Sequence, residues 1–155
     1  MTGPFILRNL CAALLLLAAP LLAGTARAAE TDVIPAAALI QPAELAAEMK
    51  GAPPTILQVG FSKLYEQAHI PGAVYAGPGR SEDGLTNLKT HVEALPRDAP
   101  LVIYCGCCPW NRCPNMGAAY TALKAMGFTK LKALYIADNF GQDWVDKGYP
   151  VVRGQ

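Results

Sequence analysis

Residues 101–115, "LVIYCGCCPWNRCPN", set out the architecture of the region around them. The apolar and partly β-branched run Leu101–Tyr104 predicts a buried β-strand. A cysteine-rich loop follows, and residues 115–126 have helical spacing and are closed by Gly127. The stretch therefore predicts a strand, a loop with four cysteines and one arginine, and a helix, in that order.

Short β-branched runs alternate with helical patterns along the rest of the chain. Further strands are predicted at residues 55–59, 73–76 and 130–136, and further helices beginning at Pro42, Ser62, Leu85 and Phe140. Strands that alternate with helices in this way form a parallel sheet with helices on both faces. The length suits one such domain, so the predicted fold class is single-domain α/β.

The first 28 residues differ in character from the rest. They hold Arg8, an apolar run over residues 10–22 and the small-x-small pattern Ala26-Arg27-Ala28 of signal peptidase sites. The apolar run is shorter than the roughly 20 residues that span a bilayer, so no stable membrane anchor is expected. We predict a signal peptide over residues 1–28, a loose segment over 29–39 and the domain over 40–155. The protein is then exported, and periplasmic in a Gram-negative bacterium.

Removal of that segment leaves little net charge. The chain carries thirteen basic and twelve acidic residues, and loss of Arg8 and Arg27 leaves eleven basic residues and a formal charge of −1. Such a domain has no strong field to attract nucleic acid or anionic lipid. No nucleic-acid partner is expected.

All four cysteines of the mature chain, Cys105, Cys107, Cys108 and Cys113, lie in one loop. Disulfides among them would close very short loops, so stabilisation of the fold does not explain them. Structural zinc usually takes two separated cysteine pairs, which the adjacent Cys107 and Cys108 fit poorly. Copper(I), which accepts fewer thiolates, is a comparable alternative, but we predict no cofactor and no resident metal.

The cysteine spacing bears on two kinds of thiol chemistry, thiol–disulfide exchange and phosphate hydrolysis. Residues 105–108 contain a Cys-x-x-Cys, the spacing typical of thiol–disulfide exchange, so a redox role stays open. A phosphatase signature, Cys-x₅-Arg, would need a cysteine at position 106, where the sequence has glycine. A phosphatase is excluded.

The position of Cys105 favours a nucleophile. It stands at the end of a predicted strand, where open α/β sheets bind ligands. The following helix begins near Pro114, so its N–H groups and positive dipole end face the loop. Arg112 would lower a thiol pKa and hold an anionic substrate. Trp110 either covers the site or packs the loop down.

Several stretches together resemble the rhodanese-like family. "LVIYC" and residues 118–151 are similar to the C-terminal half of such a domain, and "YEQAHIPGAVYA" at residues 65–76 resembles its signature Y-x-x-G-H-I-P-G-A. The resemblance spans about residues 40–152. It implies a sulfurtransferase in which Cys105 takes sulfane sulfur from a small donor anion such as thiosulfate. The persulfide then passes its sulfur to cyanide, a small thiol or a protein thiol.

The composition of the loop suggests roles for its other residues in such a reaction. Arg112 and Trp110 would bind the donor, and Cys107, Cys108 and Cys113 would be resolving thiols or an alternative nucleophile. An inactive rhodanese-like binding module and an exported thiol-redox or metal-handling protein are the alternative functions.

Two departures from the family pattern bear on the nucleophile. The usual Asp-x-Arg after the second strand is replaced by Gln58-Val59-Gly60. Cys105 lies 22 positions before Gly127, against about 17 in the family, so the loop is about five residues longer. Position after the strand favours Cys105, whereas the spacing to Arg112 also fits Cys107. We favour Cys105, because the sheet fixes a strand end while a longer loop can shift its arginine.

Sequencing of the exported protein from its N-terminus is expected to begin at Ala29. The small side chains at positions 26 and 28 fit the peptidase pockets, and the short apolar run favours release. A mature start upstream of Leu22, or retention of the whole chain in the membrane, would contradict this prediction.

Overall fold

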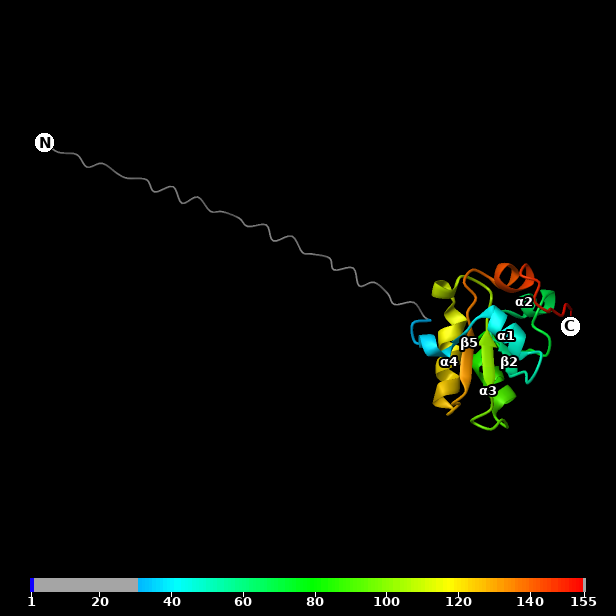
Figure 1. The fold of residues 1–155 in the computed structure, drawn as a ribbon. Helices are drawn as coiled ribbons and strands as arrows, with labels where there is room; N and C mark the ends of the chain where they lie inside the picture. Colours follow the sequence, from blue (N-terminus) through cyan, green and yellow to red (C-terminus); the bar gives the residue numbers. More distant parts are fainter. Residues whose placement is uncertain (2–30, 155) are drawn as a thin grey trace.

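A computed structural model describes Met1 and residues 31–154 (Figure 1). Apart from Met1, the predicted signal peptide therefore lies outside the described residues. Within residues 31–154, no helix combines the length and the apolar character needed to cross a bilayer. The predicted α/β fold with a parallel sheet is confirmed by the strand arrangement that follows.

Five parallel strands form one sheet in the order β1-β5-β4-β2-β3. Their bounds are β1 Leu39–Ile40, β2 Thr55–Gln58, β3 Val74–Tyr75, β4 Leu101–Tyr104 and β5 Leu131–Leu134. All four residues of the central β4 are buried, which explains why its sequence is apolar on both faces. The sequence did not predict β1, since two residues are too few to show an alternating pattern.

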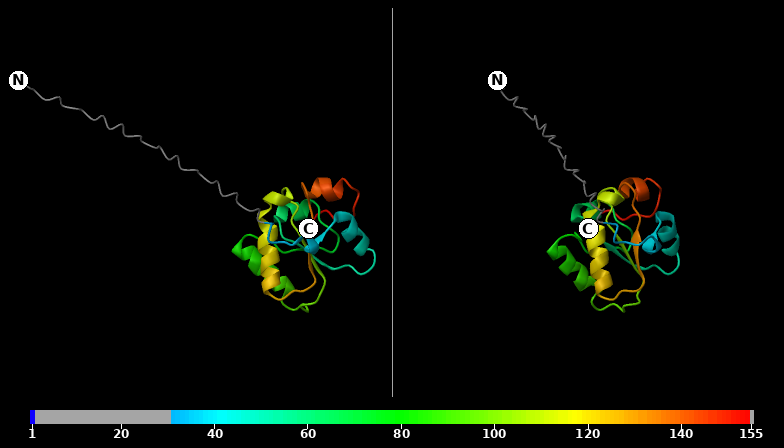
Figure 2. Two further views of the ribbon diagram at one scale, coloured as in Figure 1. Left: turned by 60° about the vertical axis from the view of Figure 1, so that its left-hand side comes forward. Right: turned by 90° about the vertical axis from the view of Figure 1, so that its left-hand side faces the viewer.

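Helices cover both faces of the sheet. The main helices are α1 Pro42–Glu48, α2 Ser62–Gln67, α3 Glu82–Val92 and α4 Pro114–Ala125, and the short ones are η1 Ala36–Ala38, η2 Trp110–Arg112 and the π-helix η3 Gly141–Val145. Leu88 of α3 and Leu123 of α4 belong to the core on one face. Leu45 of α1 and Trp144 of η3 belong to the core on the other. The right-hand view of Figure 2 shows α3 and α4 on the side of the sheet opposite α1.

Helix α3 begins three residues before its predicted start at Leu85. The glycine and acidic residues of "SEDG" suggested a loop, but the Ser81 side chain caps the helix by accepting a hydrogen bond of 3.0 Å from the Gly84 N–H. Glu82 and Asp83 then occupy the first turn, where negative charge is favourable. Glycine is required at position 84, because a Cβ there would collide with the Pro78 carbonyl group.

The C-terminal segment is fastened beside α2. His69 and Val152 form an antiparallel bridge through two backbone hydrogen bonds of 2.9 Å. The buried His69 ring stacks on Tyr65 with centroids 3.8 Å apart, and its Nδ1 lies 2.8 Å from the Tyr65 carbonyl oxygen. This histidine of the His-Ile-Pro-Gly-Ala stretch thus makes packing contacts, and the bridge brings Arg153 to the Gln67 carbonyl.

Gly84→Ala is expected to destabilise the fold by about 1–3 kcal/mol, since the added methyl forces α3 away from Pro78. The loss should appear although alanine is favoured over glycine inside a helix by roughly 0.8–1.0 kcal/mol. Urea unfolding measures the difference. Gly51→Ala is the control, because the nearest atom to a Cβ there is 4.0 Å away. A Gly84→Ala protein as stable as the parent would contradict the close approach.

Candidate active site in the cysteine loop

The cysteine loop, residues 105–113, joins β4 to α4 at the carboxyl edge of the sheet. Cys105 directly follows β4, which is hydrogen-bonded to β2 on one side and to β5 on the other. The residue is 2% exposed. Because two neighbouring strands hold β4, the sheet fixes the point at which the loop begins.

The end of β2 forms one wall against Cys105. The buried Gln58 amide donates to the Cys105 carbonyl oxygen over 3.4 Å and accepts from the Gly60 N–H over 3.2 Å. A Cβ on Gly60 would lie 3.0 Å from that carbonyl oxygen and 3.1 Å from the Cys105 sulfur. The sequence has Gly60 where the family pattern has arginine. In the structure Cys105 fills the space beside position 60, so a larger side chain there would contact the Cys105 oxygen and sulfur.

Three of the four sulfur atoms gather into one cluster. The Sγ atoms of Cys105, Cys107 and Cys113 all lie within 4.8 Å of one another, and we call these residues the sulfur trio. The Cys105 and Cys107 sulfurs are 3.1 Å apart, and the Cys108 sulfur lies 3.0 Å from that of Cys107. All four thiols are free. The structure thus brings together residues that the sequence spaces over nine positions.

Asn115 supports the trio, although its sequence position did not mark it as a site residue. Its side chain is 0% exposed, and its Nδ2 donates to the sulfurs of Cys105 at 3.3 Å and Cys107 at 3.8 Å. Its Oδ1 accepts from the Arg80 N–H at 3.2 Å. Its role could have been suspected from the sequence only because it directly follows Cys113-Pro114, in the first turn of α4. Asn115 thereby links the cysteine loop to the segment before α3.

Negative charge in the trio is favoured on Cys113, which precedes α4 as its N-cap. Hydrogen bonds from the Cys105 and Cys107 thiols lower the pKa of Cys113, and the backbone N–H groups of Asn115 and Met116 lower it further against the effect of burial. The pKa of Cys107 is raised by its hydrogen bonds to Cys105 and Cys113 and by burial. The Cys107 contact lowers the pKa of Cys105, but the bond to Cys113 and burial outweigh it and raise the value.

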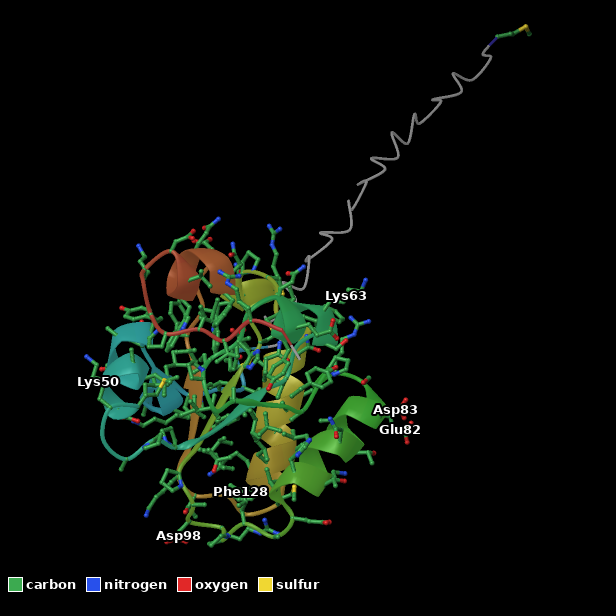
Figure 3. The ribbon with its side chains drawn as sticks, turned by 90° about the vertical axis from the view of Figure 1, so that its right-hand side faces the viewer. Lys50, Lys63, Glu82, Asp83, Asp98 and Phe128 are labelled. Carbon is green, nitrogen blue, oxygen red and sulfur yellow. The ribbon has the colours of Figure 1, made fainter. Side chains whose placement is uncertain are left out.

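Cys107 is the member of the trio that faces open space. It is half-buried and lines two hollows, one of about 650 Å³ and one of about 410 Å³. Lys63 contributes to the larger hollow and Arg153 to the smaller. Cys105 and Cys113 line a cavity of about 10 Å³ instead. Lys63 belongs to α2 and lies at the end of the molecule opposite Asp98 and Phe128 (Figure 3).

The two other predicted site residues lie on the outer part of the loop. Arg112 is exposed, its N–H donates to the Pro109 carbonyl at 2.9 Å, and its own carbonyl accepts from the Cys108 thiol at 3.6 Å. The half-buried Trp110 ring packs on Tyr135 with centroids 5.2 Å apart. Trp110 therefore packs the loop down, and it also lines the small cavity with Cys105 and Cys113.

Comparison with known proteins agrees with the fold. A family model described as Rhodanese-like domain matches residues 41–145. No curated protein is similar enough to the chain to count as a match. The crystal structure of the Alr3790 protein from Anabaena sp. is 20% identical with a TM-score of 0.56, over 74% of this chain and 92% of that one.

Two further solved structures share the fold. The BH2092 protein from Bacillus halodurans is 18% identical with a TM-score of 0.57, over 74% of this chain and 75% of that one. EanB, solved in complex with hercynine, is 17% identical with a TM-score of 0.53, over 74% of this chain and 27% of that one. These structures show the fold, and the family model covers most of the chain. The chain therefore belongs to the rhodanese-like domain family.

Proposed function

We propose that the protein is a sulfurtransferase that carries sulfane sulfur as a persulfide on its cysteine loop. The observation that supports this most directly is the position of Cys107. Its thiol meets two hollows that also hold Lys63 and Arg153, while two further sulfurs lie behind it. Cationic side chains in a concave site favour a small donor anion such as thiosulfate. On the basis of the residues 26–28 pattern, we propose that the protein acts after export.

The reaction has two covalent steps. A loop thiolate attacks the outer sulfur of thiosulfate, a new sulfur–sulfur bond forms, and sulfite leaves with the electron pair of the broken bond. An acceptor such as cyanide or a thiolate then attacks the outer sulfur of the persulfide and restores the thiolate. The N-terminus of α4 and the Asn115 amide face the cluster, so they stabilise the negative charge that moves among the sulfurs.

Cys107 and Cys105 take different steps of the reaction, because Cys107 is accessible to the donor and Cys105 is buried at the end of β4. The sequence favours Cys105 as the nucleophile, but this residue is 2% exposed and lies behind Cys107. We therefore propose that the donor meets Cys107 first, after Cys107 passes its proton to the Cys113 thiolate with which it shares a hydrogen bond. In-line attack on the outer sulfur needs the Cys105 and Cys107 sulfurs farther apart than their 3.1 Å, and Cys107 can give that room by moving toward the hollows. The Cys105 thiolate then takes over the persulfide sulfur while Cys107 leaves as a thiolate. Cys105 then holds the sulfur in the more buried position.

Thiol–disulfide exchange is the second candidate function. The 3.1 Å separation of the Cys105 and Cys107 sulfurs favours it, because two thiols so close can pair after a modest movement. Formation of that disulfide would release two protons and pass two electrons to an oxidised thiol partner.

Treatment of the reduced protein with thiosulfate is expected to add one sulfur atom that cyanide removes, as read by intact mass. Cys107→Ser should load at less than about a tenth of the parent rate, because the accessible thiol is gone. Cys105→Ser should still load, with the extra sulfur found on the Cys107 peptide. Cys108→Ser is the matched control from the same loop and should load normally.

Other mass changes separate the alternatives. If Cys107→Ser gains sulfur normally and Cys105→Ser gains none, Cys105 is the thiol that attacks thiosulfate. A loss of two hydrogen atoms on mild oxidation, with no sulfur gained by any variant, would favour the thiol–disulfide function. An inert, fully reduced protein would favour a binding module.

Arg112→Lys is expected to raise the KM for thiosulfate roughly 3- to 10-fold, with a smaller change in release of sulfur from a loaded persulfide. Lysine keeps the charge but loses the planar fork that holds an anion at two points. The effect is moderate because Arg112 is exposed and lines neither hollow beside Cys107. Steady-state kinetics measure both constants. Arg97→Lys is the control, since its guanidinium lies over the Phe128 ring away from the loop. Unchanged thiosulfate kinetics in a folded Arg112→Ala protein would contradict donor binding by this residue.

A further inference from the structure

We propose that Cys105, Cys107 and Cys113 form a binding site for one copper(I) ion. The three Sγ atoms lie within 4.8 Å of one another, so a single ion between them can reach all three. Their contributions come from the end of β4, from the loop and from the N-cap of α4. The proposal concerns metal binding by the reduced protein and does not depend on sulfur transfer.

The spacing of the trio is close to that of a three-coordinate thiolate site. With metal–sulfur bonds of about 2.3 Å, three sulfurs in a plane lie about 4.0 Å apart. The Cys105 and Cys107 sulfurs, now 3.1 Å apart, would have to separate by about 1 Å. Cys107 can make that movement because it borders the two hollows, whereas Cys105 and Cys113 are held by β4 and α4.

The number and type of ligands select the metal. Soft thiolates favour copper(I), which accepts three ligands, whereas structural zinc almost always takes four. Among the described residues, the group of cysteine, histidine and acidic side chains at this place contains only the trio. Cys108 is the nearest further sulfur, but it follows Cys107 directly and lies outside the group. The trio therefore offers three thiolates, the number that copper(I) accepts and one fewer than a four-thiolate structural zinc site.

The surroundings suit an anionic metal–thiolate group. Three thiolates around one copper(I) ion carry net negative charge, and the N-terminus of α4 and the Asn115 Nδ2 group both face it with positive partial charge. The side chains of Cys105 and Cys113 are 2% and 3% exposed, so two of the three ligands are shielded from water and oxidants. Bound copper(I) would also occupy the thiols proposed to carry sulfur, so the metal and the persulfide would exclude each other.

Titration of copper(I) into the reduced protein without oxygen, in competition with the chromogenic chelator bathocuproine disulfonate, tests the site. The protein is expected to withdraw one copper(I) per chain. Replacement of Cys105, Cys107 or Cys113 by serine should weaken binding at least about tenfold, while Cys108→Ser, the matched control, should bind within about threefold of the parent. Circular dichroism of each variant shows whether it folds.

Two readouts on the parent protein keep the test independent of the variants. X-ray absorption is expected to show three sulfur neighbours at about 2.3 Å. One equivalent of copper(I) should protect Cys107, the accessible member of the trio, from iodoacetamide while Cys108 is still alkylated, as read by peptide mass.

Several results would overturn the site. These are no withdrawal of copper(I) from the chelator, two or four sulfur neighbours, loss of binding in Cys108→Ser equal to that of the trio variants, or displacement of copper(I) by one equivalent of zinc. No sulfur donor is present in these measurements. A protein that binds copper(I) but never gains sulfur from thiosulfate would refute the sulfurtransferase proposal alone, and the reverse result would refute the metal site alone.

Discussion

The side-chain amide of Asn115 makes the contacts on which the arrangement of the cysteine loop depends. Its Nδ2 group faces two sulfurs, and its Oδ1 atom holds the backbone before α3. Gly79 approaches so closely that a Cβ there would lie 2.6 Å from the Asn115 carbonyl oxygen. An aspartate of the same shape would offer only acceptors when ionised and would place a second negative charge beside the sulfurs. Both functions of the amide are therefore needed at this position.

The strands and helices that the sequence predicts correctly are those with strong periodic or capping patterns. Leu101–Tyr104 is apolar throughout because it is the central strand. The predicted end of α4 at Gly127 is correct because Gly127 adopts a φ of 91°, which terminates a helix. The place of Cys105 at the carboxyl edge followed from the strand alone. Strand β1 and the true start of α3 were missed, because pairing with β5 and capping by Ser81 are each made by one or two residues.

The arrangement inside the loop could not be predicted from sequence. Position along the chain does not tell that Cys113, eight residues after Cys105, returns to it, or that Cys107 faces outward. Asn115 looked like an ordinary residue of the first helical turn. These features depend on how nine residues fold back over the sheet, and no periodic pattern encodes such a path. The roles of Cys105, Cys107 and Arg112 therefore stay predictions that the mass and kinetic measurements address.

The long loop is nevertheless fixed at several points. Gly106 adopts a φ of 72°, and a Cβ there would lie 2.6 Å from that of Phe140, whose N–H donates to the Gly106 carbonyl. Trp110 donates from its backbone to Ala137 and packs its ring on Tyr135. The loop thus rests on the segment after β5. It forms a structured cover that carries three sulfurs besides that of Cys105.

The fastening of the C-terminal segment to His69 affects how the protein is best prepared. Val152 is held in the bridge, and Arg153 lines the smaller hollow beside Cys107. An affinity tag fused after Gln155 would begin three positions beyond Arg153. A tag rich in histidine would in addition bring metal-binding side chains close to a cluster of thiols. Protein freed of any C-terminal fusion is therefore the appropriate material for studying this loop.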